Sequence, residues 1–298
     1  MMISAPECSV VMAVYNDEQH IYRSVLSVLN QTLRNFEFII VDDCSTDQTP
    51  AILAQLAQHD ARLRVIRNAR NIERSRSRNR AIIEEAKTPY IMIVDSDDVS
   101  MPDRLERQFA AMQADPTLTA IGGQYHHVTP EGEILAGSRL PTGEKAIKES
   151  LRRRNPVWTA AAMVRKDTFD ALGGYDTKLV YAEDYDLTWR LSLRGRIDNL
   201  NDVVMLVHWD WRKERRVFYS RRLNHMKIRL KWLRTVGFKP QDLGAAFVYL
   251  ASGLIPPQIG QIYQRRRYSQ PAPAEFVVLA RQWLHTLEEQ EQRLRTAS

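Results

Sequence analysis

The segment Tyr90-Ile-Met-Ile-Val-Asp-Ser-Asp-Asp98 runs from uninterrupted apolar side chains directly into a cluster of acidic ones. An apolar run of this length is typical of a strand in a parallel sheet that is covered on both faces. Ligands of open parallel sheets bind beyond the carboxyl ends of the strands. The acidic cluster is therefore predicted to lie at a binding edge of the sheet. Ser100, with Pro102 just inside, predicts that a helix follows, through about residue 114.

Three similar strand–helix units precede this segment. Strands are predicted at residues 8–15, 36–41 and 63–67, because each is a short, mostly apolar run. Asp17 is predicted to cap the first helix, and Thr46 and Asp47 to open a second that ends near residue 59. A basic third helix is predicted over residues 74–86. Four successive units predict an α/β fold with a Rossmann-like, mostly parallel sheet flanked by helices.

The pattern changes downstream of residue 118. Strand-like pieces lie near residues 119–127, 157–164 and 202–208, with a helix predicted over 182–193. Beyond residue 212 the signals are helical, and prolines separate the last segments. We predict one domain over residues 1–211, in two halves (1–118 and 119–211), and a helical C-terminal extension over 212–298. Its helices are expected at about residues 213–235, 242–254 and 275–296.

The charge of the chain is unevenly distributed. The net charge of the 298 residues is +6, but residues 205–298 contain 17 Lys and Arg against 7 Asp and Glu. The remaining residues carry 25 basic against 29 acidic side chains, so the excess of basic charge lies in the C-terminal third. That third has no nucleic-acid recognition motif, so nucleic-acid binding is not expected. The apolar stretch over residues 243–255 is bracketed by basic clusters. It fits either a helix lying on an anionic membrane surface or a buried core helix, and the sequence leaves both open.

Composition excludes several classes of protein. With 44% hydrophobic and 26% charged residues, the chain is typical of a globular protein rather than a disordered or fibrous one. No apolar run reaches the roughly 18 residues of a membrane-spanning helix, and no secretory signal is recognised. Cys8 and Cys44 form neither a disulfide framework nor a zinc-site spacing. We therefore expect a cytoplasmic protein, with the inner face of the plasma membrane as its alternative place.

Three polar motifs fall at the ends of predicted strands: Tyr15-Asn16, Asp42 to Asp47, and Asp95 to Asp98. Carboxylates packed this densely repel one another unless a cation or a hydrogen-bonding ligand compensates them. Hard oxygen ligands suit Mg²⁺ or Mn²⁺, and Mg²⁺ is usually shared between carboxylates and substrate phosphates. Turn and cap roles alone also explain Asp42 and Asp43. A calcium loop of the EF-hand type is excluded, because Ser100 stands where that loop has its glycine and no helix precedes the acidic cluster.

Read in order, these motifs make the chain resemble the family 2 glycosyltransferases of the GT-A fold. The resemblance covers about residues 8–215. It rests on Val14-Tyr-Asn16, VDDCSTD over 41–47, SRSRN over 75–79, DSDD over 95–98, PDRLE over 102–106, GGYD over 173–176 and AEDYDL over 182–187. The family implies that residues 1–118 bind the nucleotide and that 119–211 form the acceptor half.

The resemblance also implies a role for each matching residue. Ala13 and Tyr15 line the base pocket, Asp43 bonds a base such as uracil, and Arg78 holds the base or the diphosphate. Asp95 lies near the ribose, and Asp184 is the general base of an inverting transfer to a glycan or lipid-linked acceptor. The implied metal ligands, for Mn²⁺ or Mg²⁺, are Asp97 and Asp98. Further implied contacts to the nucleotide-diphosphate sugar come from Ser96, Glu183 and Arg212.

The chain departs from the family pattern at three points. Glu73 and Ser77 stand where the family often has Gly and Ala, and Glu214 stands where many members have a His that contacts metal or diphosphate. His126, His127 and His208 are interpreted as packing or surface residues rather than as substitutes. Asp186 lies four residues before Arg190, which predicts an ordinary helical ion pair.

Two rival functions are considered. A sugar-phosphate nucleotidyltransferase of the same fold opens with a Gly-rich loop, and residues 8–17 contain no glycine. A non-catalytic nucleotide-sugar-binding protein is the rival from another class, because the departure at Glu214 is what lost turnover would produce. Retained nucleotide affinity without sugar transfer would identify that rival.

Overall fold

The computed structural model describes residues 5–137, 139–209, 218–240, 242, 244 and 270–296. The N-terminal half alternates strands and helices and ends with two short strands and the helix that follows them. In chain order it contains β1 (Cys8–Val14), α1 (Ile21–Leu29), β2 (Phe36–Asp42), α2 (Thr49–His59), β3 (Leu63–Arg67), α3 (Arg74–Asn79), η1 (Arg80–Glu85), β4 (Tyr90–Val94), β5 (Val99–Ser100) and α4 (Arg104–Ala114).

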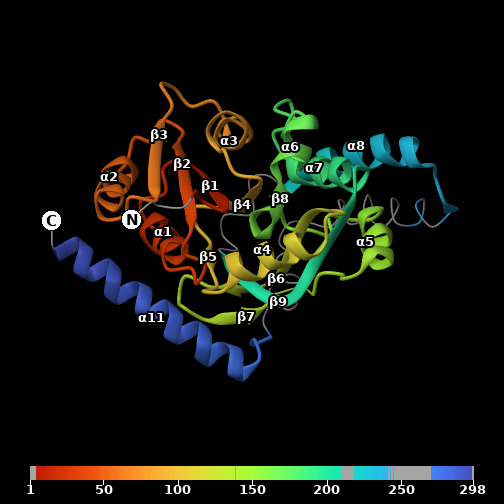
Figure 1. Ribbon diagram of the computed structural model, residues 1–298. Helices are drawn as coiled ribbons and strands as arrows, with labels where there is room; N and C mark the ends of the chain where they lie inside the picture. The colour runs from red at the N-terminus through yellow and green to blue at the C-terminus, as the bar shows by residue number, and fades with distance from the viewer. Residues whose placement is uncertain are drawn as a thin grey trace.

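The second half adds long strands and short helices. It contains β6 (Leu118–Val128), β7 (Ile134–Ala136), α5 (Glu144–Leu151), η2 (Thr159–Ala161), β8 (Met163–Arg165), α6 (Lys166–Ala171), α7 (Glu183–Ser192), β9 (Arg196–His208), α8 (Phe218–Val236) and α11 (Ala274–Thr296). Figure 1 shows α1 to α3 around the first three strands and α7 with α8 at the opposite end of the molecule.

One nine-stranded sheet organises the fold, in the order β3-β2-β1-β4-β8-β6-β9-β5, with β7 paired to β6. Strands β1 to β4 pair parallel with one another, and β6 pairs parallel with β9. Strand β8 runs antiparallel to both β4 and β6, so it joins the two parallel groups. The predicted α/β fold with a mostly parallel sheet is confirmed, and the carboxyl ends of β1, β2 and β4 meet at one edge as expected.

The apolar runs that predicted the strands form the core. Val10, Phe38, Ile40 and Met92 are fully buried, and α1 lays its apolar face against the same side of the sheet. The opposite face carries a second cluster, which includes Ile39, so both faces of the sheet are covered. Because every side chain of β4 except Tyr90 is buried, the first residues able to reach solvent are those of the acidic cluster that follows it.

Several predicted boundaries were wrong. The first helix begins at Ile21, and the carboxylate of Asp17 instead accepts hydrogen bonds from Ser96 and pairs with His20. The helix after the acidic cluster begins at Arg104, because Val99–Ser100 pairs with β9 and delays the helix. The basic third helix is α-helical only to Asn79, where the π-helical turn η1 takes over.

In the second half, the strand predicted near 157–164 is reduced to β8 at 163–165, preceded by the single 3₁₀ turn η2. Strand β9 begins six residues before the predicted 202–208 piece, because it pairs along most of β6. Elements β7, α5 and α6 were not predicted. Each is at most eight residues long, which gives too few repeats for a clear periodicity.

The last helix packs back on the N-terminal half. Helix α11 lies along α1 (Figure 1), and its Ala280 and Leu287 are fully buried in the first core cluster. The indole of Trp283 donates to the carbonyl oxygen of Ser100 at 3.0 Å, and Gln290 bonds Asn30. Among the described residues, no helix is long and apolar enough to cross a membrane. The predicted helix over 242–254 lies outside the described residues, apart from Asp242 and Gly244, and so do the basic clusters at 212–216 and 265–267, whereas Arg221 and Arg222 lie on α8.

Candidate active site

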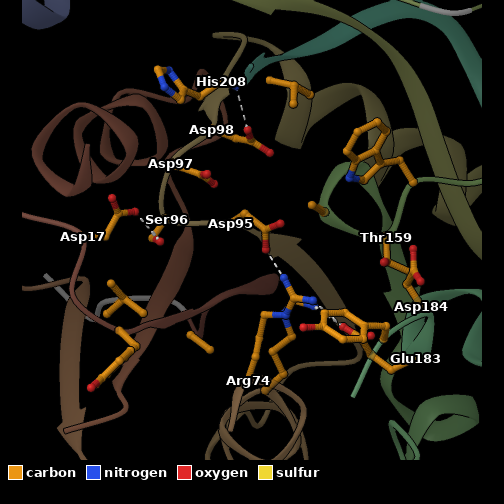
Figure 2. A pocket seen from close by; sticks show the side chains of 18 of the residues that line it. Asp17, Arg74, Asp95, Ser96, Asp97, Asp98, Thr159, Glu183, Asp184 and His208 are labelled. Atoms are coloured by element: carbon orange, nitrogen blue, oxygen red, sulfur yellow. Dashed lines mark hydrogen bonds and ion pairs between the residues drawn. The ribbon is translucent and has the colours of Figure 1, made fainter. Parts of the chain in front are cut away.

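A pocket of about 740 Å³ opens where the ends of β1, β2 and β4 face the start of α7. Every site residue predicted from the sequence that the structure describes lines this pocket; Arg212 lies outside the described residues. The predicted residues in the lining are Ala13, Tyr15, Asp43, Arg78, Asp95, Ser96, Asp97, Asp98, Glu183 and Asp184. In Figure 2, Ser96 and Asp97 lie on one side of the pocket and Glu183 and Asp184 on the other.

The acidic cluster after β4 is compact. Ligand oxygens of Asp95, Asp97 and Asp98 all lie within 4.8 Å of one another. Asp98 accepts a hydrogen bond from the backbone N–H of His208 at 3.0 Å, which ties the cluster to the end of β9. Ser96 turns the other way and donates to Asp17 at 2.6 Å. The loop therefore presents three carboxylates from four consecutive residues.

These carboxylates differ in how well the protein compensates them. Burial alone would raise the pKa of Asp95, but the guanidinium groups of Arg78 and Arg74 hold it below its usual value. Desolvation, together with the charges of Asp95 and Asp17, raises the pKa of Asp97 to about 6. Desolvation and the charge of Asp97 raise the pKa of Asp98 well above its usual value. Two carboxyl groups are therefore left without a full counter-charge, and this hard-oxygen donor set fits a divalent cation.

The second wall is tied to the first through a buried charge network. Arg78 donates to Asp95, and its other terminal nitrogen lies 3.9 Å from Glu183. Arg74 bonds the same Glu183 oxygen at 2.7 Å. Because the side chains of Arg78 and Glu183 are each only 4% exposed, this network holds α3 and the start of α7 in a fixed relation to the end of β4.

Asp184 lies in the first turn of α7. One carboxylate oxygen accepts from the side-chain amide of Asn155 at 3.1 Å, and the other accepts from the backbone N–H of Tyr185 at 2.8 Å. Ala182, just before the helix, has a left-handed backbone with φ of 65°. The turn there lets the chain enter α7 with both Glu183 and Asp184 at the pocket.

Asp186 has the structural role that its spacing predicted. It is fully buried, accepts from Arg190 at 2.8 Å, and also accepts from Lys231 and from the indole of Trp232 on α8. The ring of Trp232 stacks on Trp189 at 6.0 Å. The helical ion pair is confirmed, and it also fastens α8 to α7.

At the other end of the pocket, Asp43 is buried and held by three donors. The amide of Asn68 and the backbone N–H groups of Ile72 and Glu73 bond its two oxygens at 2.7 to 3.0 Å. Glu73 has φ of 78° and ψ of 151°, a backbone region that is essentially reserved for glycine. Glu73, which departs from the family pattern, is thus a strained residue beside the expected base pocket. Tyr15, the aromatic residue expected in that pocket, is 49% exposed.

The SRSRN and GGYD motifs contact each other directly. The side-chain amide of Asn79 donates to the carbonyl oxygen of Tyr175 at 2.9 Å and accepts from its backbone N–H at 2.8 Å. A Cβ at Gly174 would lie 2.4 Å from the Asn79 oxygen, so the glycine is required by this close approach. Two segments almost a hundred residues apart are thereby fixed beneath the pocket.

The three histidines pack against aromatic rings, as interpreted from the sequence: His126 on Phe276 of α11, His127 on Tyr125 and Trp209, and His208 on His20. His127 and His208 also line the pocket, which the sequence did not indicate. Sequence reasoning also missed Asn155, Trp158 and Tyr181. These residues stand in the stretches before β8 and α7, and nothing in the sequence shows that both stretches fold toward the acidic cluster.

A family model and a sequence relative both indicate the same protein family. The sequence model described as glycosyl transferase family 2 matches residues 9–173. An uncharacterized glycosyltransferase of Methanocaldococcus jannaschii is 30% identical over 267 residues, covering 84% of this chain and 90% of the relative.

Two solved structures share the fold. S. aureus TarS 1–349 in complex with UDP-GlcNAc superposes with a TM-score of 0.63 at 20% identity, over 82% of this chain and 71% of that one. A mannosyltransferase of Pyrobaculum calidifontis in complex with GDP-Man and Mn²⁺ gives a TM-score of 0.59 at 17% identity, over 98% and 84%.

Proposed function

The chain belongs to glycosyl transferase family 2, and from that premise we propose that it transfers a sugar from a nucleotide-diphosphate sugar, most simply a UDP-sugar, to a glycan or lipid-linked glycan with inversion. The observation that supports the proposal best is the opposition of Asp184 to the acidic cluster across one pocket (Figure 2). A single displacement needs a base on one side of the anomeric carbon and a charge-stabilised leaving group on the other.

The donor occupies the wall formed by the N-terminal half. Ala13 and Tyr15 flank the base, and the second oxygen of Asp43, which receives one protein donor, accepts from the base. Asp95, held by Arg78, lies by the ribose. UDP-GlcNAc and GDP-Man are bound by the two structural neighbours, and the same class of donor is proposed for this chain.

Asp97 and Asp98 would hold a divalent cation, Mn²⁺ or Mg²⁺, because their raised pKa values mark them as the uncompensated carboxyl groups of the cluster. A cation held there would supply positive charge that stabilises the departing diphosphate. Ser96, which donates to Asp17, and Glu183, which bonds Arg74, keep the two walls of the donor site in place. Arg212, a family match, is proposed to contribute positive charge at the diphosphate.

Asp184 is the general base in this proposal. The acceptor hydroxyl attacks the anomeric carbon as its proton moves to the free face of the Asp184 carboxylate, and the bond from the anomeric carbon to the diphosphate oxygen breaks. The hydrogen bonds from Asn155 and the Tyr185 N–H fix the carboxylate for that transfer.

Asp184→Asn tests the assignment. The amide keeps the shape but cannot take the proton, so nucleotide affinity is expected to stay within about twofold while transfer falls by roughly 10² to 10⁴. Asp202→Asn, at an exposed carboxylate paired with Arg107, is the matched control and keeps full transfer. Transfer by Asp184→Asn at the parental rate would contradict the base assignment. If the unsubstituted protein binds the nucleotide but transfers no sugar, that result would instead favour the non-catalytic binding protein.

A peripheral place at the inner face of the plasma membrane stays a prediction, because the apolar stretch and most of the basic residues that suggested it lie outside the described residues. Co-sedimentation of the full chain with anionic vesicles tests it. Binding that weakens as salt is raised would support the membrane-surface interpretation, since electrostatic attraction to anionic headgroups is screened by salt.

A further inference from the structure

A row of aromatic rings forms one wall of the pocket. Trp158 meets Tyr125 edge to face at 4.6 Å, Tyr125 meets His127 in the same way at 5.3 Å, and His127 lies 5.5 Å from Trp209. Tyr125, His127 and Trp209 are largely buried, whereas Trp158 is partly exposed and borders the cavity. Trp158 is therefore the member of this row that combines packing contacts with open surface.

The segment that carries Trp158 is held rigidly. The carbonyl oxygen of Trp158 accepts from the N–H of Ala161, and the carbonyl oxygen of Ala160 accepts from the buried guanidinium of Arg104 at 2.9 Å. On the other side, the carbonyl oxygen of Pro156 accepts from the side-chain amide of Asn199 at 2.9 Å. A fixed backbone gives the indole little conformational entropy to lose when a ligand binds.

The same segment contacts the proposed base. Asn155 begins it and donates to Asp184, and Thr159 lies beside Asp184 on the wall shown in Figure 2. The segment that carries Trp158 therefore borders the same pocket as Asp184 and contacts that carboxylate through Asn155. The donor wall, with Asp95 and Asp97, lies across the pocket.

The charge of this wall argues against an anionic ligand. Of the described lining residues, the lysines and arginines comprise Arg74 and Arg78 alone, and both are already paired with carboxylates, Arg74 with Glu183 and Arg78 with Asp95. The aromatic faces offer a negative quadrupole instead, which attracts polarised C–H groups and disfavours phosphate. A pyranose ring presents such C–H groups on one face and hydroxyls around its edge.

We propose that Asn155 to Thr159 form an acceptor subsite in which a neutral pyranose ring stacks on Trp158 with its attacking hydroxyl toward Asp184. This inference rests on the proposed function, since it names the acceptor of that reaction. It assigns the specificity for a carbohydrate acceptor to one residue, and it predicts that a pyranose rather than a bare lipid phosphate rests on Trp158.

Saturation-transfer NMR on the full chain tests the subsite without turnover. The probes are methyl β-glycosides of glucose, galactose and N-acetylglucosamine, with glycerol 3-phosphate as the anionic comparison, all in the presence of Mg²⁺ with UDP or GDP. At least one pyranoside is expected to receive saturation mainly on the C–H protons of one ring face.

Trp158→Ala weakens that binding about five- to tenfold, as expected for losing one aromatic stacking contact. Trp158→Phe retains most of it, and the control Phe238→Ala, at an exposed ring outside the pocket, retains all of it.

The outcomes separate the subsite from the enzyme. Undiminished pyranoside saturation in Trp158→Ala, or saturation of glycerol 3-phosphate alone, would overturn the subsite. So would a parent that binds nucleotide but none of the pyranosides. Nucleotide affinity measured on the same samples tests the proposed function instead: it is expected to be equal in the parent and in Trp158→Ala, and a parent that binds neither UDP nor GDP would contradict the donor site itself.

Discussion

Binding of a divalent cation to the acidic cluster should depend on pH more steeply than at an ordinary carboxylate site. Desolvation and neighbouring negative charge raise the pKa of Asp97 to about 6 and raise the pKa of Asp98 well above its usual value. A cation and a proton compete for the same oxygens, so the cation binds only after the proton has left. We therefore compare the affinity for the cation at pH 5 with that at pH 7.

The magnitude follows from the pKa of Asp97. With a value of about 6, roughly one-tenth of the carboxyl is ionised at pH 5 and roughly nine-tenths at pH 7, so apparent affinity rises about tenfold. Any titration of Asp98 in the same range increases this factor. In the absence of a cation, the free energy of unfolding changes with pH in the opposite direction to cation affinity. Because the folded state holds this proton more tightly than the unfolded chain, Asp97 lowers stability as pH rises from about 4 through 6. Asp97 is open to the pocket solvent, and screening limits that cost to roughly 1 kcal/mol.

Titration of Mn²⁺ followed by electron paramagnetic resonance measures this affinity. Nucleotide is left out, since a terminal phosphate itself titrates near pH 6. The parent is expected to gain at least about tenfold between pH 5 and 7, and Asp97→Asn to bind weakly at both values. Asp202→Asn, on the surface, should follow the parent. An affinity that stays constant with pH, or an Asp97→Asn variant that follows the parent, would refute the assignment of Asp97 as a ligand with a raised pKa.

Three further substitutions, one of them with a matched control, test how the fold supports the site. Gly174→Ala adds left-handed strain and a Cβ that would lie 2.4 Å from the Asn79 oxygen, so it should cost about 3 kcal/mol in chemical denaturation. Gly132→Ala, with φ of 82° and open space around it, should cost only the strain of about 1 kcal/mol, and equal losses would contradict the contact argument. Glu73→Gly relieves a backbone that favours glycine and should gain about 1 kcal/mol, seen as a higher melting temperature; a lower one would show that the side chain, not the strain, matters there. Asp186→Ala leaves its two basic partners unpaired and should cost about 3 kcal/mol, and a loss under 1 kcal/mol would mean that α8 is fastened to α7 by packing alone.

The donor half could be predicted from the sequence because its signals are local. Each of the first four strands is an apolar run, and the polar residues at three strand ends mark the binding edge without any tertiary information. The position of Asp95 to Asp98 beyond β4 follows from the alternation of elements alone. The same local rules misplaced helix starts where a distant segment intervenes, as at Ser100, which pairs with Met205 of β9.

The acceptor side could not be predicted, because its residues are brought together by non-local pairing. His208 reaches the pocket through the long β6–β9 register, and Trp158 reaches it because Arg104 and Asn199 hold its segment from both sides. These contacts join residues far apart in the chain, so no periodic pattern in the sequence indicates them. The role of Asp184 came from the family motif, since charge pairing alone explains an acid in the first turn of a helix equally well.

The most direct test of the account is binding and slow hydrolysis of a panel of nucleotide sugars, with and without Mn²⁺. The account predicts that one UDP- or GDP-sugar binds in a metal-dependent manner and is slowly hydrolysed when no acceptor is present. Asp97→Asn should abolish the metal dependence. Failure of every nucleotide sugar to bind, with Mn²⁺ present and the protein folded, would contradict the donor site that the acidic cluster and the pocket define.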